Sequence, residues 1–83
     1  MIRLYDITID EYEEMVEAQS GLCAICGGLP RGRSNVLVVD HCHTTGVIRG
    51  LLCHPCNHGI AIIGDTEERL QAAVNYLKRP GRV

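Results

Sequence analysis

The sequence predicts a small α+β domain that is held together by a metal ion. Three observations lead to this prediction: the chain has only 83 residues, it carries two Cys-x-x-Cys pairs, and a β-hairpin pattern lies between patterns typical of helices. A chain of this length buries only about 60% of the surface that it exposes when unfolded. Its aromatic residues are three tyrosines, with no Phe or Trp to fill a core. The fold therefore needs disulfides, a metal or a partner subunit as a further source of stability.

A helix is expected over residues 9–19. Thr8 is suited to cap its first turn, and Glu11 stands three residues later as the partner in a capping box. Apolar side chains then recur at helical spacing: Ile9, Tyr12, Met15 and Val16. Gly21 is expected to end this helix.

The centre of the chain predicts one hairpin, and two helices are expected after it. Aliphatic residues 36–39 are typical of a strand, residues 44–46 of a turn, and residues 47–52 of a returning strand. Pro55 suits an early helical position, and a short helix is expected over residues 57–63, ended by Gly64. A last helix is expected from Thr66 to about Arg79.

Charge is divided unevenly along the chain. Residues 1–20 carry one basic and six acidic side chains, whereas residues 21–60 carry three arginines against one aspartate. The net charge of −2 and a pI near 6.0 argue against a non-specific nucleic-acid coat, although a few focused phosphate contacts remain compatible with them. No membrane span is expected, and the N-terminus lacks the apolar stretch of a secretory signal. We therefore expect an intracellular, reducing setting, which favours a metal over disulfides.

The two cysteine pairs, Cys23 with Cys26 and Cys53 with Cys56, are candidate zinc knuckles. Two residues between the thiolates let both sulfurs reach one Zn²⁺ at about 2.3 Å. The 26 residues between the pairs exceed the spacing of a simple zinc ribbon, but they contain the hairpin, whose two ends one ion would tie together. Redox pairs or buried free thiols are the alternatives, and the βαβ context of a thioredoxin motif is absent. Cys42 is expected to be a small filler on the opposite strand face, with a fifth metal ligand as the alternative.

A second set of polar residues stands at the end of the first strand of the hairpin. His41 and His43 share a face by the two-residue period, and Asp40 faces away unless a bulge or strand end intervenes. Asn57 follows the second knuckle. Carboxylate and amide oxygens suit Mg²⁺ or Mn²⁺ better than zinc, and a neutral imidazole can take a proton from water near pH 7. These are parts for metal-assisted phosphodiester hydrolysis, but the same histidines could equally cap turns or surround the zinc.

The order of these motifs resembles the phage recombination endonuclease VII family, which belongs to the HNH, or ββα-metal, nucleases. The likeness extends over about residues 5–78. It is carried by the first cysteine pair, by Val39-Asp40-His41-Cys42-His43-Thr44-Thr45-Gly46, by Val47-Ile48-Arg49-Gly50-Leu51-Leu52, and by the second pair with Asn57.

The resemblance implies one HNH domain over residues 1–83, with flanking N- and C-terminal helices. Knuckles at 23–26 and 53–56 would staple the hairpin, and the catalytic hairpin and helix would span residues 36–63. The fold implied is thus a ββα-metal fold.

The resemblance also implies a role for each polar residue. Asp40 and Asn57 would hold a catalytic Mg²⁺ or Mn²⁺, His41 would be the general base, and His43 would assist at the scissile phosphate. Arg49 matches the family's basic residue near the substrate. The four knuckle cysteines match the family's structural zinc site.

The implied activity is that of a metal-dependent DNA endonuclease that nicks or cuts DNA in the bacterial cytoplasm. Phage packaging or recombination proteins are candidate partners. Ile60 departs from the family pattern because it offers no further carboxylate one turn after Asn57. The full-length junction-resolving enzyme also has a C-terminal dimerisation region, which we do not expect within these 83 residues, so the oligomeric state stays open, with a monomer among the options. The alternative function is a non-catalytic zinc module that binds DNA or protein, and a redox protein is a more distant one.

Overall fold

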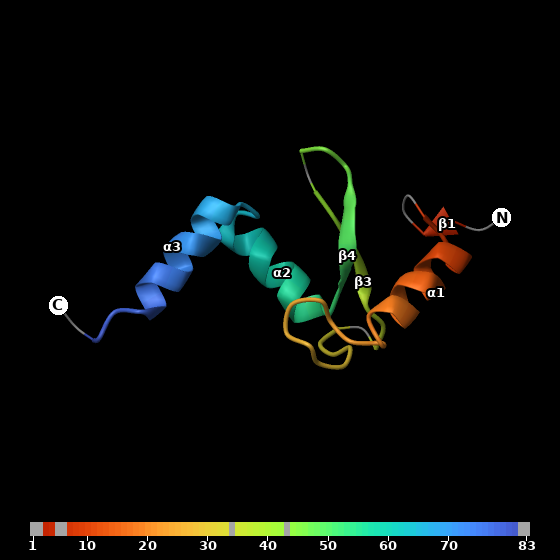
Figure 1. Cartoon of the computed structure of the whole chain (residues 1–83), viewed down its shortest axis with the longest axis horizontal. Helices are drawn as coiled ribbons and strands as arrows, with labels where there is room; N and C mark the ends of the chain where they lie inside the picture. Colours follow the sequence, from red (N-terminus) through yellow and green to blue (C-terminus); the bar gives the residue numbers. More distant parts are fainter. Residues whose placement is uncertain (1–2, 5–6, 34, 43, 82–83) are drawn as a thin grey trace.

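Three helices and two short two-stranded sheets form the described part of the chain. A computed structural model describes residues 3–4, 7–33, 35–42 and 44–81. The elements are β1 (Arg3–Leu4), β2 (Ile7–Thr8), α1 (Ile9–Ala18), β3 (Val38–His41), β4 (Ile48–Leu52), α2 (His54–Ile63) and α3 (Glu67–Leu77). The β3–β4 hairpin stands between α1 on one side and α2 on the other, and α3 folds away at the far end (Figure 1). The molecule is therefore elongated, with extents of 56 × 27 × 22 Å.

The predicted capping box at the start of α1 is confirmed. The Thr8 hydroxyl accepts a hydrogen bond from the Glu11 amide (3.1 Å), and the Glu11 carboxylate accepts one from the Thr8 amide (2.8 Å). Thr8 also pairs with Arg3 in the antiparallel β1–β2 ladder. This small N-terminal hairpin was not predicted, because two-residue strands are too short to show an alternating pattern.

The central hairpin is confirmed, but its first strand begins later than expected. The prediction of a strand over residues 36–39 is wrong by two residues, because β3 runs from Val38 to His41. Leu37 is buried before the strand starts, and its carbonyl accepts a hydrogen bond from the Tyr12 hydroxyl of α1. Asp40 and His41 therefore lie within the strand and not beyond its end.

The helix after the hairpin starts three residues earlier than expected. The predicted start at residue 57 is wrong, because α2 begins at His54 directly after Cys53, and Pro55 occupies its first turn. Proline suits this place because its missing N–H needs no partner there. The chain leaves α2 at Gly64, and Thr66 caps α3 by accepting a hydrogen bond from the Arg69 amide (3.1 Å). Among the described helices, none is long and apolar enough to cross a membrane.

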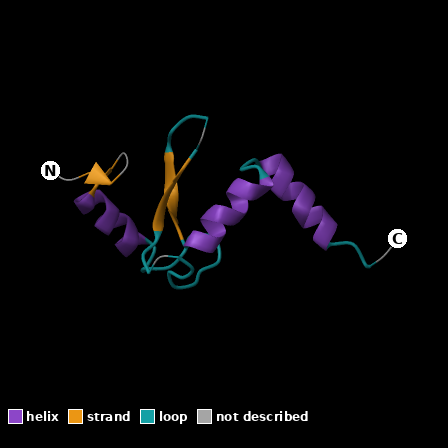
Figure 2. Ribbon diagram, turned by 180° about the vertical axis from the view of Figure 1, so that it is seen from behind, coloured by secondary structure: helices purple, strands orange, loops and turns teal. Residues whose placement is uncertain are grey.

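The core is small and lies where α1, the hairpin and the start of α2 meet. Figure 2 shows the molecule from behind. The long connection between α1 and β3 lies at this same end of the hairpin. The buried apolar side chains are Ile7, Cys23, Leu37, Val39, Leu51, Leu52 and Cys53. Two of them, Cys23 and Cys53, belong to the predicted zinc knuckles, so the candidate metal site and the core share residues.

The side chain of Gln19 closes the outer edge of β4. Its amide oxygen accepts a hydrogen bond from the Leu51 N–H (2.9 Å), and its amide nitrogen donates to the Leu51 carbonyl (3.0 Å). A glutamine side chain thus pairs with Leu51 as a neighbouring strand would. A Cβ at Gly50 would lie 3.3 Å from the same amide oxygen, so this close approach favours glycine there.

We expect Gln19→Ala to lower the free energy of unfolding of the zinc-saturated protein by about 1–3 kcal/mol. Leu51 is fully buried, and the substitution leaves its N–H without this acceptor. Chemical denaturation at fixed zinc concentration measures the change. Gln71→Ala is the matched control, because Gln71 is exposed on α3 and bonds to Asn75. Equal losses in the two variants would contradict the role of Gln19.

Candidate functional site

Four cysteines from two distant segments form one cluster. The sulfur atoms of Cys23, Cys26, Cys53 and Cys56 all lie within 4.8 Å of one another. The first two come from the loop after α1, and the last two come from the start of α2. All five cysteines lie in the described part of the chain, and none forms a disulfide.

The spacing of these sulfurs fits a tetrahedral metal site. Zn–S bonds of about 2.3 Å in a tetrahedron place two sulfurs about 3.8 Å apart. The Sγ atoms of Cys26 and Cys53 are 3.8 Å apart. Two backbone amides point at the first knuckle: Ile25 N–H at Cys23 Sγ and Gly28 N–H at Cys26 Sγ, both at 3.4 Å. These donors stabilise thiolates, so the cluster could hold a structural metal such as zinc.

The thiols of the cluster influence one another's ionisation. Burial raises the pKa of Cys23, but hydrogen bonds from the backbone of Cys53, Cys26 and Ile25 outweigh it and bring that pKa to about 6. At Cys56, burial and the neighbouring thiols raise the pKa to about 12. Four thiolates in contact repel one another, and a divalent cation removes this repulsion.

Arg31 lies beside this cluster, whereas the fifth cysteine, Cys42, lies outside it. The neighbouring Cys26 side chain raises the pKa of Arg31. A cation is well placed there, because four thiolates and Zn²⁺ together carry a charge of about −2. Cys42 lies in the turn after β3, outside the cluster, so the alternative that it is a fifth ligand is not supported.

Asp40, Arg49 and Asp65 form a second polar cluster, which joins the hairpin to the turn after α2. Arg49 binds the Asp40 carboxylate with two hydrogen bonds, Nε to Oδ2 at 2.7 Å and Nη2 to Oδ1 at 3.0 Å. Its Nη2 also donates to Asp65 Oδ1 at 2.8 Å. Hydrogen bonds to these two carboxylates raise the pKa of Arg49 above its ordinary value. One guanidinium is thus shared between a buried strand residue and the turn between α2 and α3.

A bulge in the hairpin brings Asp40 and Arg49 together. Asp40 pairs with Gly50, but the next residue, His41, pairs with Ile48, so Arg49 is the extra residue on β4. In a regular ladder Arg49 would oppose His41 and would face away from Asp40. The bulge re-aims its side chain instead. The sequence made a bulge or a strand end near Asp40 a condition for bringing Asp40 and the histidines together, and a bulge is present there.

Of the other predicted catalytic residues, His41 and Asn57 lie in the described part of the chain. His41 ends β3 next to Asp40, and its carbonyl accepts a long hydrogen bond of 3.4 Å from Arg49. Asn57 lies in the first half of α2, where its backbone N–H donates to the Cys53 carbonyl (3.1 Å). No contact between its side chain and Asp40 is found among the described residues. His43 lies outside the described residues.

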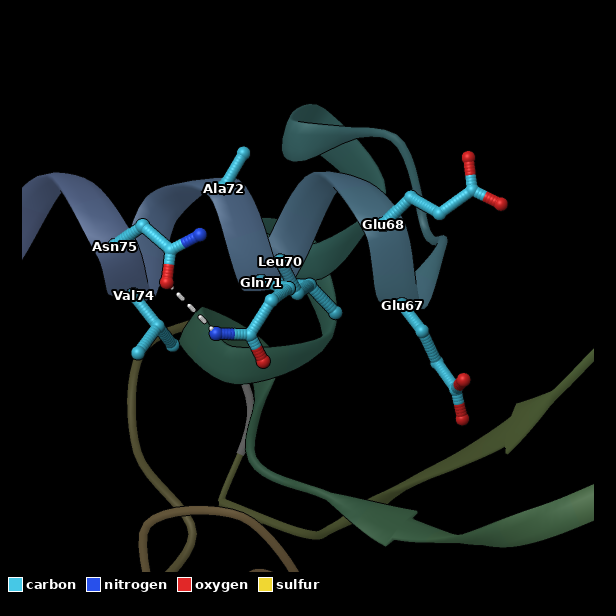
Figure 3. Close-up of a pocket in the computed structure, with 7 residues that line it drawn as sticks. All are labelled: Glu67, Glu68, Leu70, Gln71, Ala72, Val74 and Asn75. Atoms are coloured by element: carbon cyan, nitrogen blue, oxygen red, sulfur yellow. Dashed lines mark hydrogen bonds between the residues drawn. The ribbon is translucent and has the colours of Figure 1, made fainter.

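A cavity of about 310 Å³ opens between the hairpin and the two C-terminal helices. Asp40, Arg49 and Asp65 line it together with Ile60 and Glu67. A larger hollow of about 700 Å³ runs along α3 (Figure 3), but all the side chains that line it come from that one helix. In the described part of the chain, no second element lines this larger hollow. We therefore regard the smaller cavity as the candidate site.

Asp65 is the residue of this site that was missed. Its side chain is only 17% exposed, although it lies in a turn between helices. An aspartate after a glycine at a helix end is ordinary turn chemistry, and nothing local in the sequence pairs it with Arg49, 16 residues earlier. Only the length of α2 and its angle to the hairpin create this contact.

Comparisons with known proteins agree with this arrangement of motifs. The family model described as recombination endonuclease VII matches residues 1–79. The gene 59 protein of Mycobacterium phage D29 is 43% identical over 86 aligned positions, and that of Mycobacterium phage L5 is 40% identical over 84. Both alignments cover all of this chain but only 50% and 51% of the phage proteins. The chain thus spans about half the length of these relatives.

We expect Cys53→Ser to release the metal and unfold the domain, because metal binding supplies folding free energy of order 10 kcal/mol. Elemental analysis and circular dichroism of the purified protein measure both effects. Cys42→Ser is the matched control and should keep about one zinc per chain. Well-folded wild-type protein with less than about half an equivalent of zinc would contradict a structural zinc site.

Proposed function

Because the chain belongs to the recombination endonuclease VII family, we propose that it is a metal-dependent DNA endonuclease of the HNH type. The observation that carries the proposal is the buried carboxylate of Asp40, paired with Arg49 and directly followed by His41 at a bulge. The order β3–β4–α2 is the order that a ββα-metal fold requires, which supports the same assignment.

The candidate ligands for a catalytic cation are oxygen atoms. Asp40 offers a carboxylate on β3, and Asn57 offers an amide oxygen on α2, beside the cysteine cluster that fixes this helix. Such a donor set fits Mg²⁺ or Mn²⁺, which keep several positions for water and phosphate. When bound, the cation would stabilise charge on the phosphate and on the leaving oxygen.

The side chains around these ligands transfer the proton and bind the phosphate. His41 takes a proton from the attacking water, as a general base. His43 assists at the scissile phosphate. Arg49 is the nearby cation that binds the phosphate, since its planar guanidinium can contact two oxygens at once. The cysteine cluster takes no part in the reaction and holds α2 against the hairpin.

The proposed setting follows from the relatives. Their names assign them to mycobacteriophages. We therefore place the activity in the bacterial cytoplasm on phage or host DNA, with phage recombination or packaging proteins as candidate partners. A non-catalytic zinc module that binds DNA or protein is the alternative, and absence of cleavage by folded, zinc-loaded protein would favour it.

We expect His41→Ala to lower the rate of DNA cleavage by about 10² to 10⁴-fold, the usual contribution of a general base. DNA affinity and zinc content should stay nearly unchanged. Cleavage of supercoiled plasmid measures the rate. His58→Ala on the exposed face of α2 is the matched control and should remain active. A larger loss in His43→Ala than in His41→Ala would reverse the two roles.

We expect Asn57→Ala to raise the concentration of Mg²⁺ or Mn²⁺ needed for cleavage, because one of only two protein ligands is lost. Added Zn²⁺ should inhibit at concentrations at which Mg²⁺ activates, since zinc prefers nitrogen ligands and would occupy the histidines. Activity titrations with each cation measure both effects, with Asn75→Ala on α3 as the control. Full activity in excess chelator, with the cysteine-bound zinc retained, would refute a catalytic cation.

A further inference from the structure

We propose that Asp65 is a positioning residue that holds Arg49 at the site while Asp40 binds the catalytic cation. This inference rests on the proposed function and assigns a role to a residue outside the predicted site. In the structure described here, Arg49 contacts Asp40 and Asp65 at the same time, at 2.7 Å and 2.8 Å.

Arg49 and a divalent cation compete for the same atoms. Arg49 occupies both oxygens of the Asp40 carboxylate, one with Nε and one with Nη2. A cation on these oxygens would lie within a few ångströms of the guanidinium, and like charges at this distance repel strongly where water is scarce. Asp40 is only 8% exposed, so water screens the site poorly. Cation binding therefore requires Arg49 to leave Asp40.

Asp65 can keep the Arg49 side chain bound after it has moved away from Asp40. Its carboxylate binds Nη2, one of the two nitrogens that also contact Asp40. Rotation about this contact would withdraw Nε from Asp40 without releasing the side chain. The Arg49 side chain is 37% exposed, which leaves it room for such a movement.

The backbone fixes Asp65 in this place. Its N–H donates to the Ile60 carbonyl (2.8 Å), and its φ of 56° lies in the left-handed region. Thr66 follows as the cap of α3. The acceptor is thus held at a helix junction. Asparagine tolerates a left-handed φ better than most residues, so Asp65→Asn removes the charge while keeping the turn.

Charge explains why this arrangement suits a phosphodiester. The side chains of Asp40, Arg49 and Asp65 together carry one net negative charge in the structure. With a divalent cation on Asp40 and Arg49 retained by Asp65, the same group carries one positive charge. The site would therefore attract a phosphate only after the cation has bound.

The test is calorimetric titration of Mn²⁺ into zinc-loaded protein without DNA. We expect Asp65→Asn to raise the Kd for Mn²⁺ roughly tenfold, because Arg49 then has only Asp40 as a carboxylate partner. Glu67→Gln is the matched control, since Glu67 lines the same cavity and the substitution removes the same charge. It should change the Kd less than about twofold.

The double variant separates positioning from direct ligation. In an Arg49→Ala background, Asp65→Asn should change the Kd for Mn²⁺ less than about twofold, because Asp65 acts through Arg49. An equal, roughly tenfold effect in both backgrounds would overturn the inference and make Asp65 a metal ligand. No effect in either background would overturn it as well.

One further comparison distinguishes failure of this inference from failure of the proposed function. Mn²⁺ binding that Asp40→Asn abolishes, together with cleavage by the wild-type protein, supports the proposed function whatever Asp65 does. Wild-type protein that neither binds Mn²⁺ at Asp40 nor cleaves DNA would overturn both.

Discussion

The cluster of four cysteines is the constraint on which the rest of this small structure depends. It joins the loop after α1 to the start of α2, and these segments precede and follow the hairpin in the sequence. Cys23 and Cys53 are also part of the core, which is too small to fix the helices alone. A metal in this cluster would therefore set the angle between α2 and β3. That angle decides whether Asn57 and Asp65 face the end of the strand that carries Asp40.

Arg49, the single extra residue on β4, determines the electrostatics of the candidate site. Without the bulge, Arg49 would lie on the opposite face of the sheet from Asp40, and the buried carboxylate would lack this partner. With the bulge, the guanidinium of Arg49 neutralises the buried carboxylate of Asp40. The same guanidinium also binds the carboxylate of Asp65. Buried charges are tolerated when they are paired with an opposite charge or bind a metal.

Features that depend on neighbouring residues were predictable from the sequence, whereas features that depend on the arrangement of helices were not. The capping box of Thr8 and Glu11, the knuckle pairs and the turn at residues 44–46 all follow from local spacing, and the structure agrees with them. The start of β3 was misjudged because hydrophobicity marks Val36 as a strand residue, although it lies 58% exposed before the strand. The contact of Asp65 with Arg49 requires the exit geometry of α2, which no local pattern encodes. The roles of His41, His43 and Asn57 remain predictions.

The pairing of Gln19 with Leu51 has a consequence for how the protein behaves beside other copies of itself. A two-stranded sheet exposes two rows of backbone groups that can template the addition of a foreign strand. At Leu51, the middle of the most apolar stretch of β4, both of these groups are already occupied by a side chain of the same molecule. The glutamine at the end of α1, together with the Ala24 N–H that also donates to the Leu51 carbonyl, thus blocks the addition of a foreign strand at this position of β4, where larger sheets use a whole helix or a further strand.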